Sequence, residues 1–299
     1  MNLLPLELTV RVGCHIVYKT LQPTPILLVI RPRSDHQQMV RQEKLTFSSN
    51  LNSCDFEDAH GNLTHRTTLV PGQNVIHHDA LVAVSSQPDN QGQPTYATSI
   101  NELPPLVLRY ILPSRYCDSD KLLNFATQQF GRFTIGIDQV YAICNWVHGN
   151  IEYRTGSGRP DISTSEVIAR GYGVCRDFAH VVITLCRALN LPARYVTGHL
   201  PDIGFMNPLT PMDFHAYLEV YLGGQWCTFD ARFNVPRIGR VKIAHGLDAV
   251  DGAFGTIFGP AQLDYFEAWA YQVDPGAVSI DDPIDLSKRL DGVEYVRTS

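Results

Sequence analysis

The chain has 299 residues, of which 44% are hydrophobic and 18% charged, and its formal net charge at pH 7 is -6. This composition is ordinary for a globular protein, and the negative charge without any run of Lys or Arg argues against a nucleic-acid or anionic-membrane partner. The first residues lack the basic segment and apolar core of a secretion signal, and no apolar stretch approaches the length of a membrane span.

The seven cysteines are an odd number, widely scattered and without a CxxC pair. Such spacing favours reduced thiols over a disulfide framework or a zinc site. We therefore expect a cytoplasmic protein without a disulfide framework or a cysteine zinc site, and no residue pattern indicates a cofactor.

Residues 1–112 predict an antiparallel β domain, because apolar residues alternate with polar ones and no helical period persists. The expected strands cover residues 6–12, 26–30, 45–47, 65–70 and 74–84, with a turn over residues 55–62. Residues 85–98 are polar and rich in Pro and Gln, which is typical of a linker.

Residues 113–299 predict a second domain that starts with helices and continues with strands. Apolar residues at helical spacing indicate helices near residues 122–130, 138–149, 163–169 and 175–189. The pattern then changes to strict alternation in residues 193–200, 214–222 and 226–230. Helices followed by strands predict an α+β fold for this part of the chain.

The segment from Gly171 to Leu191 contains the first candidate catalytic residue. A turn-like GYG leads directly into a helix whose first residue is, or nearly is, Cys175. Free backbone N–H groups and the positive end of the helix dipole stabilise a thiolate at that position, and the thiolate is the form that attacks a carbonyl carbon. A cysteine considered alone is more often a buried structural residue, so this interpretation depends on the partners that follow.

His215 and Asp230 are the predicted partners of Cys175. Gly223 and Gly224 indicate a tight hairpin between the last two strands. If Leu222 pairs with Gln225, His215 and Asp230 become diagonal neighbours on one face, within reach of an imidazole and a carboxylate. The opposite face is then apolar and suited to the core: Ala216, Leu218, Val220, Leu222, Cys227 and Phe229. A slip of one residue would move Asp230 to that apolar face.

The other histidines and acids fit these roles less well. His180 points away from the start of its own helix, which favours packing or a core hydrogen bond. His199 ends a strand and is a second candidate for the base, whereas His77 and His78 are expected on a solvated strand edge. Asp213 is expected to order its loop. Asp177 lies in the first turn of the helix, where capping explains it as well as catalysis does.

Three segments carry a resemblance to a known family: GYGVCRDFAHVVITLCRALNLPARYVTG, DFHAYLEVYLGGQWCTFD and FDARFNVPRIGRVKIAHGLDAVD. Together they resemble the transglutaminase-like superfamily, whose core has the papain-like cysteine protease fold, and in particular a bacterial subgroup with a strand-rich N-terminal region. The resemblance implies helices packed on an antiparallel sheet, with Cys175 as nucleophile, His215 as base and Asp230 as orienting acid. It implies no metal site and does not identify the second oxyanion donor. Tyr153 and Tyr172 are candidates for that donor, although simple packing explains each as well.

The resemblance further implies thioester chemistry at amide or peptide bonds, and we expect a peptidase or amidase acting on a peptide or protein substrate. Two alternatives stay open. One is transfer of a glutamine acyl group to an amine, which cross-links proteins, and the other is a non-catalytic binding module on the same fold. A nucleic-acid or membrane partner is not expected, a homo-oligomer is compatible with the sequence, and the role of residues 1–112 is open.

Overall fold

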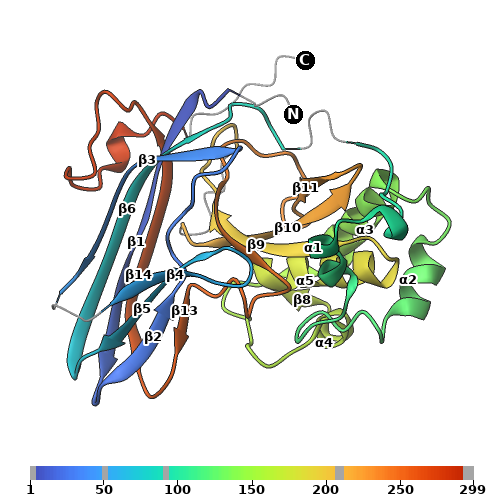
Figure 1. Ribbon diagram of the computed structural model, residues 1–299, viewed down its shortest axis with the longest axis horizontal. Coiled ribbons are helices and arrows are strands. Elements are labelled where there is room, and N and C mark those ends of the chain that lie inside the picture. The colour runs from blue at the N-terminus through green and yellow to red at the C-terminus, as the bar shows by residue number, and fades with distance from the viewer. Residues whose placement is uncertain (1–4, 49–52, 90–93, 206–211, 292–299) are drawn as a thin grey trace.

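Two four-stranded antiparallel sheets stack face to face at one end of the molecule, and the helices lie at the other end (Figure 1). The computed structural model describes residues 5–48, 53–89, 94–205 and 212–291. The first sheet has the order β14 (Gln262–Val273), β1 (Leu8–Thr20), β6 (Gly72–Val84) and β3 (Gln38–Phe47). The second has the order β13 (Gly255–Ile257), β2 (Thr24–Leu28), β5 (Leu63–Leu69) and β4 (Cys54–Glu57).

Alternation along β1 explains how the first sheet is buried. Its even-numbered residues form an apolar row on one face: Val10, Val12, Cys14, Ile16 and Tyr18. Part of this row packs against the second sheet, and Val10 and Val12 pack instead against Val241, which follows the helices in the chain. The first sheet therefore packs both against the second sheet and against the part of the chain around Val241.

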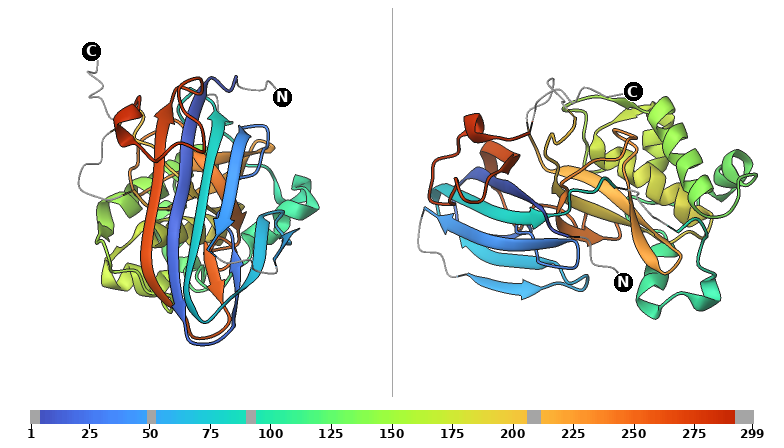
Figure 2. Two further views of the ribbon diagram at one scale, coloured as in Figure 1. Left: turned by 90° about the vertical axis from the view of Figure 1, so that its left-hand side faces the viewer. Right: turned by 90° about the horizontal axis from the view of Figure 1, so that it is seen from above.

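The last two strands of the chain return to the sheets formed by its first third. β14 runs antiparallel to β1 over almost its whole length, and β13 pairs with β2 (Figure 2). The proposed division at residue 112 stays a prediction, and the strand pairing adds that residues 255–273 complete the N-terminal sheets. These strands lie more than 200 residues from their partners, and the sequence pattern did not indicate them.

The third sheet belongs to the helical half of the molecule. Its order is β11 (Gln225–Phe229), β10 (His215–Leu222), β9 (Ala193–His199) and β12 (Val241–Gly246). The main helices are α2 (Leu123–Phe130), α3 (Ile137–Asn150), α4 (Thr164–Arg170) and α5 (Cys175–Ala188). Shorter elements are η1 (Ile100–Glu102), α1 (Pro105–Leu108), η2 (Arg109–Ile111), η3 (Leu286–Lys288) and the parallel pair β7 (Glu152–Tyr153) and β8 (Tyr172–Gly173).

Helix α5 is the centre of the second core. Its apolar side chains pack with those of α3 on one side and of β9 and β10 on the other. At its C-terminal end the buried Arg187 donates hydrogen bonds to the carbonyl groups of Ala193, Leu112 and Leu247. A cation at the C-terminus of a helix also complements its dipole. The expected α+β fold with a preceding antiparallel β region is confirmed.

Several local predictions were wrong. β3 is ten residues long, although only its last three residues were expected, and β4 occupies the first part of the expected turn at residues 55–62. His77 and His78 lie on β6, which pairs with β1 and β3 and is no edge strand, and His78 is fully buried. None of the helices in the described part of the chain has the length and apolarity needed to span a bilayer.

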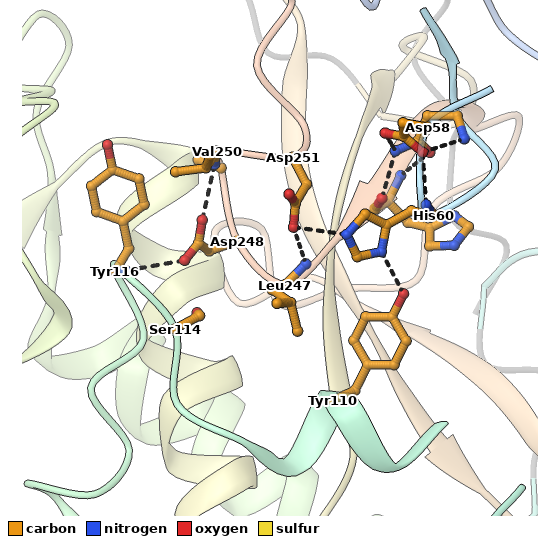
Figure 3. A network of polar contacts seen from close by, with 12 residues as sticks. Asp58, His60, Tyr110, Ser114, Tyr116, Leu247, Asp248, Val250 and Asp251 are labelled. Atoms are coloured by element: carbon orange, nitrogen blue, oxygen red, sulfur yellow. Dashed lines mark hydrogen bonds and ion pairs between the residues drawn. The ribbon is translucent and has the colours of Figure 1, made fainter. Parts of the chain in front are cut away.

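The turn after β4 is tied to the helical half by a polar network (Figure 3). The imidazole of His60 lies 2.9 Å from the Tyr110 hydroxyl and 3.1 Å from a carboxylate oxygen of Asp251. Asp251 also accepts a hydrogen bond from the backbone of Leu247. Because these residues come from three separate segments, the network holds the β sheets against the helical half.

Candidate active site

Cys175 is the first residue of helix α5, as the sequence predicted. Helix α4 ends at Gly171, whose φ of 72° lets the chain turn sharply, and β8 then leads into α5. The carboxylate of Asp177 accepts hydrogen bonds from the backbone N–H of Val174 and from Arg170, which places Asp177 in the capping role. A Cβ atom at Gly173 would lie 2.6 Å from the Asp177 side chain, so only glycine fits this approach.

The hairpin of β10 and β11 positions the two predicted partners. Leu222 pairs with Gln225 and Leu218 with Phe229, which is the register that the two-glycine turn predicted. Leu218 and Phe229 point into the core beneath α5. On the other face, Nε2 of His215 lies 2.7 Å from Oδ2 of Asp230.

The thiol of Cys175 lies beside the same imidazole. The charged groups around the imidazole shift the pKa of His215. Burial lowers the pKa of His215, but the charge and hydrogen bond of Asp230 and the contact with Cys175 outweigh burial and raise that pKa to about 9. Burial likewise raises the pKa of Asp230, yet His215 and Arg240 together hold it far below its ordinary value. The geometry therefore favours a protonated imidazole beside an ionised carboxylate at neutral pH.

Cys175 and His215 both line an open cleft of about 620 Å³. Its other walls carry Tyr153, Leu200, Asp202, Met212, Asp213, Phe214, Arg232, Phe233 and Arg237. The guanidinium of Arg232 lies over the ring of Tyr153, 3.5 Å from its centroid. Cys175 is partly exposed, whereas five of the other six cysteines are buried, so this thiol is accessible from the cleft.

The structure separates the remaining candidates. The ring of His180 stacks on Tyr116 and accepts a hydrogen bond from the backbone of Ala249, which confirms its expected core role. His199 is buried against Phe214, and burial lowers its pKa to about 3. Neither ring nitrogen of His199 has a hydrogen-bond partner among the described residues. His199 therefore takes no part in the polar contacts of His215 and Asp230.

The structure also shows where Asp213 and the two candidate tyrosines lie. Asp213 lines the cleft and accepts a hydrogen bond from the backbone N–H of Phe214. Tyr153 shares the cleft with Cys175, whereas Tyr172 stacks with the guanidinium groups of Arg154 and Arg170. Tyr153 is therefore the better placed of the two candidate oxyanion donors.

Sequence reasoning missed Arg240, which lies against the carboxylate of Asp230. One of its terminal nitrogens is 2.9 Å from Oδ2 of Asp230, and its Nε is 2.6 Å from Asp89. Arg240 lies in the loop before β12, and Asp89 lies in the segment expected to be a linker. No periodicity links two such positions, and their separation of 151 residues explains why the sequence gave no signal for the contact.

Comparison with known proteins identifies the family. The family model of the transglutaminase-like superfamily matches residues 124–231, a range that includes Cys175, His215 and Asp230. A crystal structure from Cytophaga hutchinsonii, named "putative cysteine protease", is 33% identical, covers 89% of this chain and 91% of its own, and superposes with a TM-score of 0.82. The chain belongs to the transglutaminase-like superfamily.

Two more distant matches complete this comparison. An uncharacterized protein of Mycobacterium leprae is 28% identical over 89 residues, or 29% of this chain. The match spans about a third of that relative's length (32%). The periplasmic domain of TgpA from Pseudomonas aeruginosa is 15% identical, with a TM-score of 0.39 and coverage of 77% of this chain and 91% of that domain.

The described residues offer no set of three or more His, Cys, Asp or Glu side chains arranged to hold a metal ion. The chemistry open to this site follows from Cys175 and the groups around it. A partly exposed thiol, an imidazole with a raised pKa and a buried carboxylate are the parts needed for nucleophilic attack followed by proton transfer.

Proposed function

We propose that the protein is a cysteine enzyme of the peptidase or amidase type, which cleaves amide or peptide bonds with Cys175, His215 and Asp230. One observation carries this proposal: the imidazole of His215 lies 2.7 Å from Asp230 and shares the wall of an open cleft with the Cys175 thiol. A nucleophile, a base and a group that orients the base are the parts of a catalytic triad.

The first half of the reaction forms a thioester. The thiolate of Cys175 attacks the carbonyl carbon of the substrate, and a carbon–sulfur bond forms while the carbonyl oxygen takes the negative charge. Backbone N–H groups at the start of α5 have no acceptor within the helix and can donate to this oxyanion, with Tyr153 as the proposed second donor. When the carbon–nitrogen bond breaks, the imidazolium of His215 gives its proton to the leaving nitrogen.

The second half releases the acyl group. A water molecule attacks the thioester carbon, and the neutral imidazole of His215 takes a proton from that water. The carbon–sulfur bond then breaks, which releases a carboxylic acid and restores the thiolate beside the imidazolium. Asp230 holds the ring in one orientation throughout and stabilises its charged form. An amine in place of water would give the cross-linking reaction instead.

The free state of all seven cysteines supports a reducing compartment, so we place this enzyme in the cytoplasm. The cleft is lined by aromatic and aliphatic side chains together with two arginines and two aspartates. Such a mixed apolar and charged wall suits a peptide or protein substrate.

Two parallel assays test the proposal. A library of fluorogenic peptide amides measures hydrolysis, and attachment of a biotinylated alkylamine to a glutamine-rich protein measures acyl transfer. We expect hydrolysis that disappears in Cys175→Ala and persists in Cys54→Ala, a matched control at an exposed cysteine. Incorporation of the amine without hydrolysis would favour the acyltransferase alternative. Absence of both activities with a normally reactive Cys175 would favour a binding module.

A further inference from the structure

A continuous chain of polar contacts extends from the cleft into the segment that the sequence predicted as a linker. Nε2 of His215 is 2.7 Å and a terminal nitrogen of Arg240 is 2.9 Å from the same oxygen of Asp230. The Nε of Arg240 is in turn 2.6 Å from Oδ2 of Asp89. The candidate orienting acid thus shares one oxygen between the imidazole and a cation that a second acid holds.

These groups lie where water screens their charges weakly. The side chain of Asp230 is 3% exposed, that of Arg240 6% and that of Asp89 16%. Because screening is weak in such surroundings, a change of one charge at Arg240 or Asp89 is felt at the imidazole.

Packing holds Arg240 in this position. Its guanidinium lies over the ring of Tyr217, 4.6 Å from the centroid. That ring is nearly parallel to the imidazole of His215, with an interplanar angle of 12°. Asp89 is fixed as well, since its backbone N–H donates to the carbonyl of Arg237 and its carboxylate accepts from the backbone N–H of Arg237.

The other charged and titratable groups near this chain of contacts come from several elements. His215 faces Cys175 from α5 and Asp213 from the loop that leads into β10. Asp230 faces Cys144 from α3 and Arg237 from the loop before β12. Arg237 also faces Arg240 and Asp89. The neighbouring residues are the same in all variants of Asp89 and Arg240, so the variants are compared with one another against one set of surrounding groups.

We propose that Asp89 and Arg240 are a positioning pair that sets how strongly Asp230 holds a proton on His215. The proposal deepens the proposed function, because His215 is the base of that reaction. The cation of Arg240 offsets part of the charge of Asp230, and Asp89 offsets part of the charge of Arg240. The two residues therefore act on His215 with opposite signs.

The test is an NMR titration of His215, which needs no turnover. Full-length protein carries histidine labelled with ¹³C at the ring, and the His215 signal is assigned by its absence in His215→Gln. In Arg240→Gln the charge of Asp230 is less neutralised, so the pKa of His215 should rise by about 1 unit. In Asp89→Asn the charge of Arg240 is less neutralised, so the same pKa should fall by about 1 unit. The double variant should lie between the single variants.

The control is Asp161→Asn, which breaks the exposed ion pair with Arg159 and should leave the titration unchanged. Thermal unfolding shows which variants fold. If Arg240→Gln does not fold, Asp89→Asn still decides the question, together with Arg240→Lys, which keeps the charge. Shifts of both single variants in one direction, or no shift in folded Asp89→Asn, would overturn the proposal. Because the titration requires no substrate, the proposed function can fail without affecting this result.

Discussion

The contact between His215 and Asp230 should make the stability of the protein depend on pH in a specific window. The folded structure raises the pKa of His215 from its ordinary value of 6.5 to about 9. Stability from a raised pKa is complete below the unfolded value and is lost as the pH rises through the folded value. At about 1.4 kcal/mol for each pKa unit, His215 should account for a loss of roughly 3 kcal/mol of unfolding free energy between pH 6.5 and pH 9.

Asp230→Asn is the variant that isolates this contribution. Without the carboxylate, burial holds the pKa of His215 down, so the part of the loss between pH 6.5 and pH 9 that is due to His215 should largely disappear. Histidines whose pKa burial lowers, such as His199 and His245, titrate below this window. Buried thiols such as Cys186, whose pKa burial raises to about 12, lower the stability as the pH approaches their ordinary value near 9, and they do so equally in the wild type and in Asp230→Asn.

Urea unfolding of the wild type and of Asp230→Asn at the two pH values provides the measurement. The substitution should destabilise the protein by about 3 kcal/mol more at pH 6.5 than at pH 9, and His215→Gln should show the same pattern. Asp161→Asn, at an exposed ion pair, serves as the control and should follow the wild type. Equal destabilisation by Asp230→Asn at both pH values would refute the electrostatic reasoning.

Three further predictions concern the thiol, the triad and the fold. At pH about 6, brief treatment with iodoacetamide should label Cys175 faster than the exposed Cys54. Mass spectrometry of the peptides would measure the labelling, and equal labelling of the two cysteines would contradict a thiolate at the helix terminus. Cys175→Ala and His215→Ala should each remove nearly all turnover, and the double variant should be hardly worse than Cys175→Ala alone. Activity that persists in His215→Ala but fails in His199→Ala would identify a different base. Removal of residues 262–299 should prevent folding, because β1 would lose one of its two neighbouring strands along almost its whole length. Loss of the near-UV circular dichroism would show this, and native dichroism would contradict it.

The parts of the site that the sequence predicted depend on local rules. Two adjacent glycines allow a two-residue turn, with positive φ at both Gly223 and Gly224, and this turn fixes the register of the hairpin. Once the register is fixed, alternation determines which side chains face the core. The juxtaposition of His215 and Asp230 follows from these two rules, and the start of helix α5 at Cys175 follows from the GYG turn and its apolar spacing.

The parts that the sequence did not predict depend on contacts between distant segments. Arg240 and Asp89 both lie outside helices and strands, so neither has a periodic pattern around it. β14 was missed for a related reason: its exposed first half and buried second half do not give one alternation throughout. Pairing with β1, more than 240 residues earlier, determines its position, and such pairings cannot be derived from local spacing.

The β sheets contribute directly to the site, because the residue next to the candidate base belongs to their core. Phe214 packs with Phe254 and with Phe266 of β14, in the cluster that joins the two N-terminal sheets. Its neighbour His215 begins β10 and faces the cleft. The start of this strand is therefore held from the β side by Phe214 and from the helical side by the contact of His215 with Cys175. The wall of the cleft at His215 is therefore built from both halves of the chain.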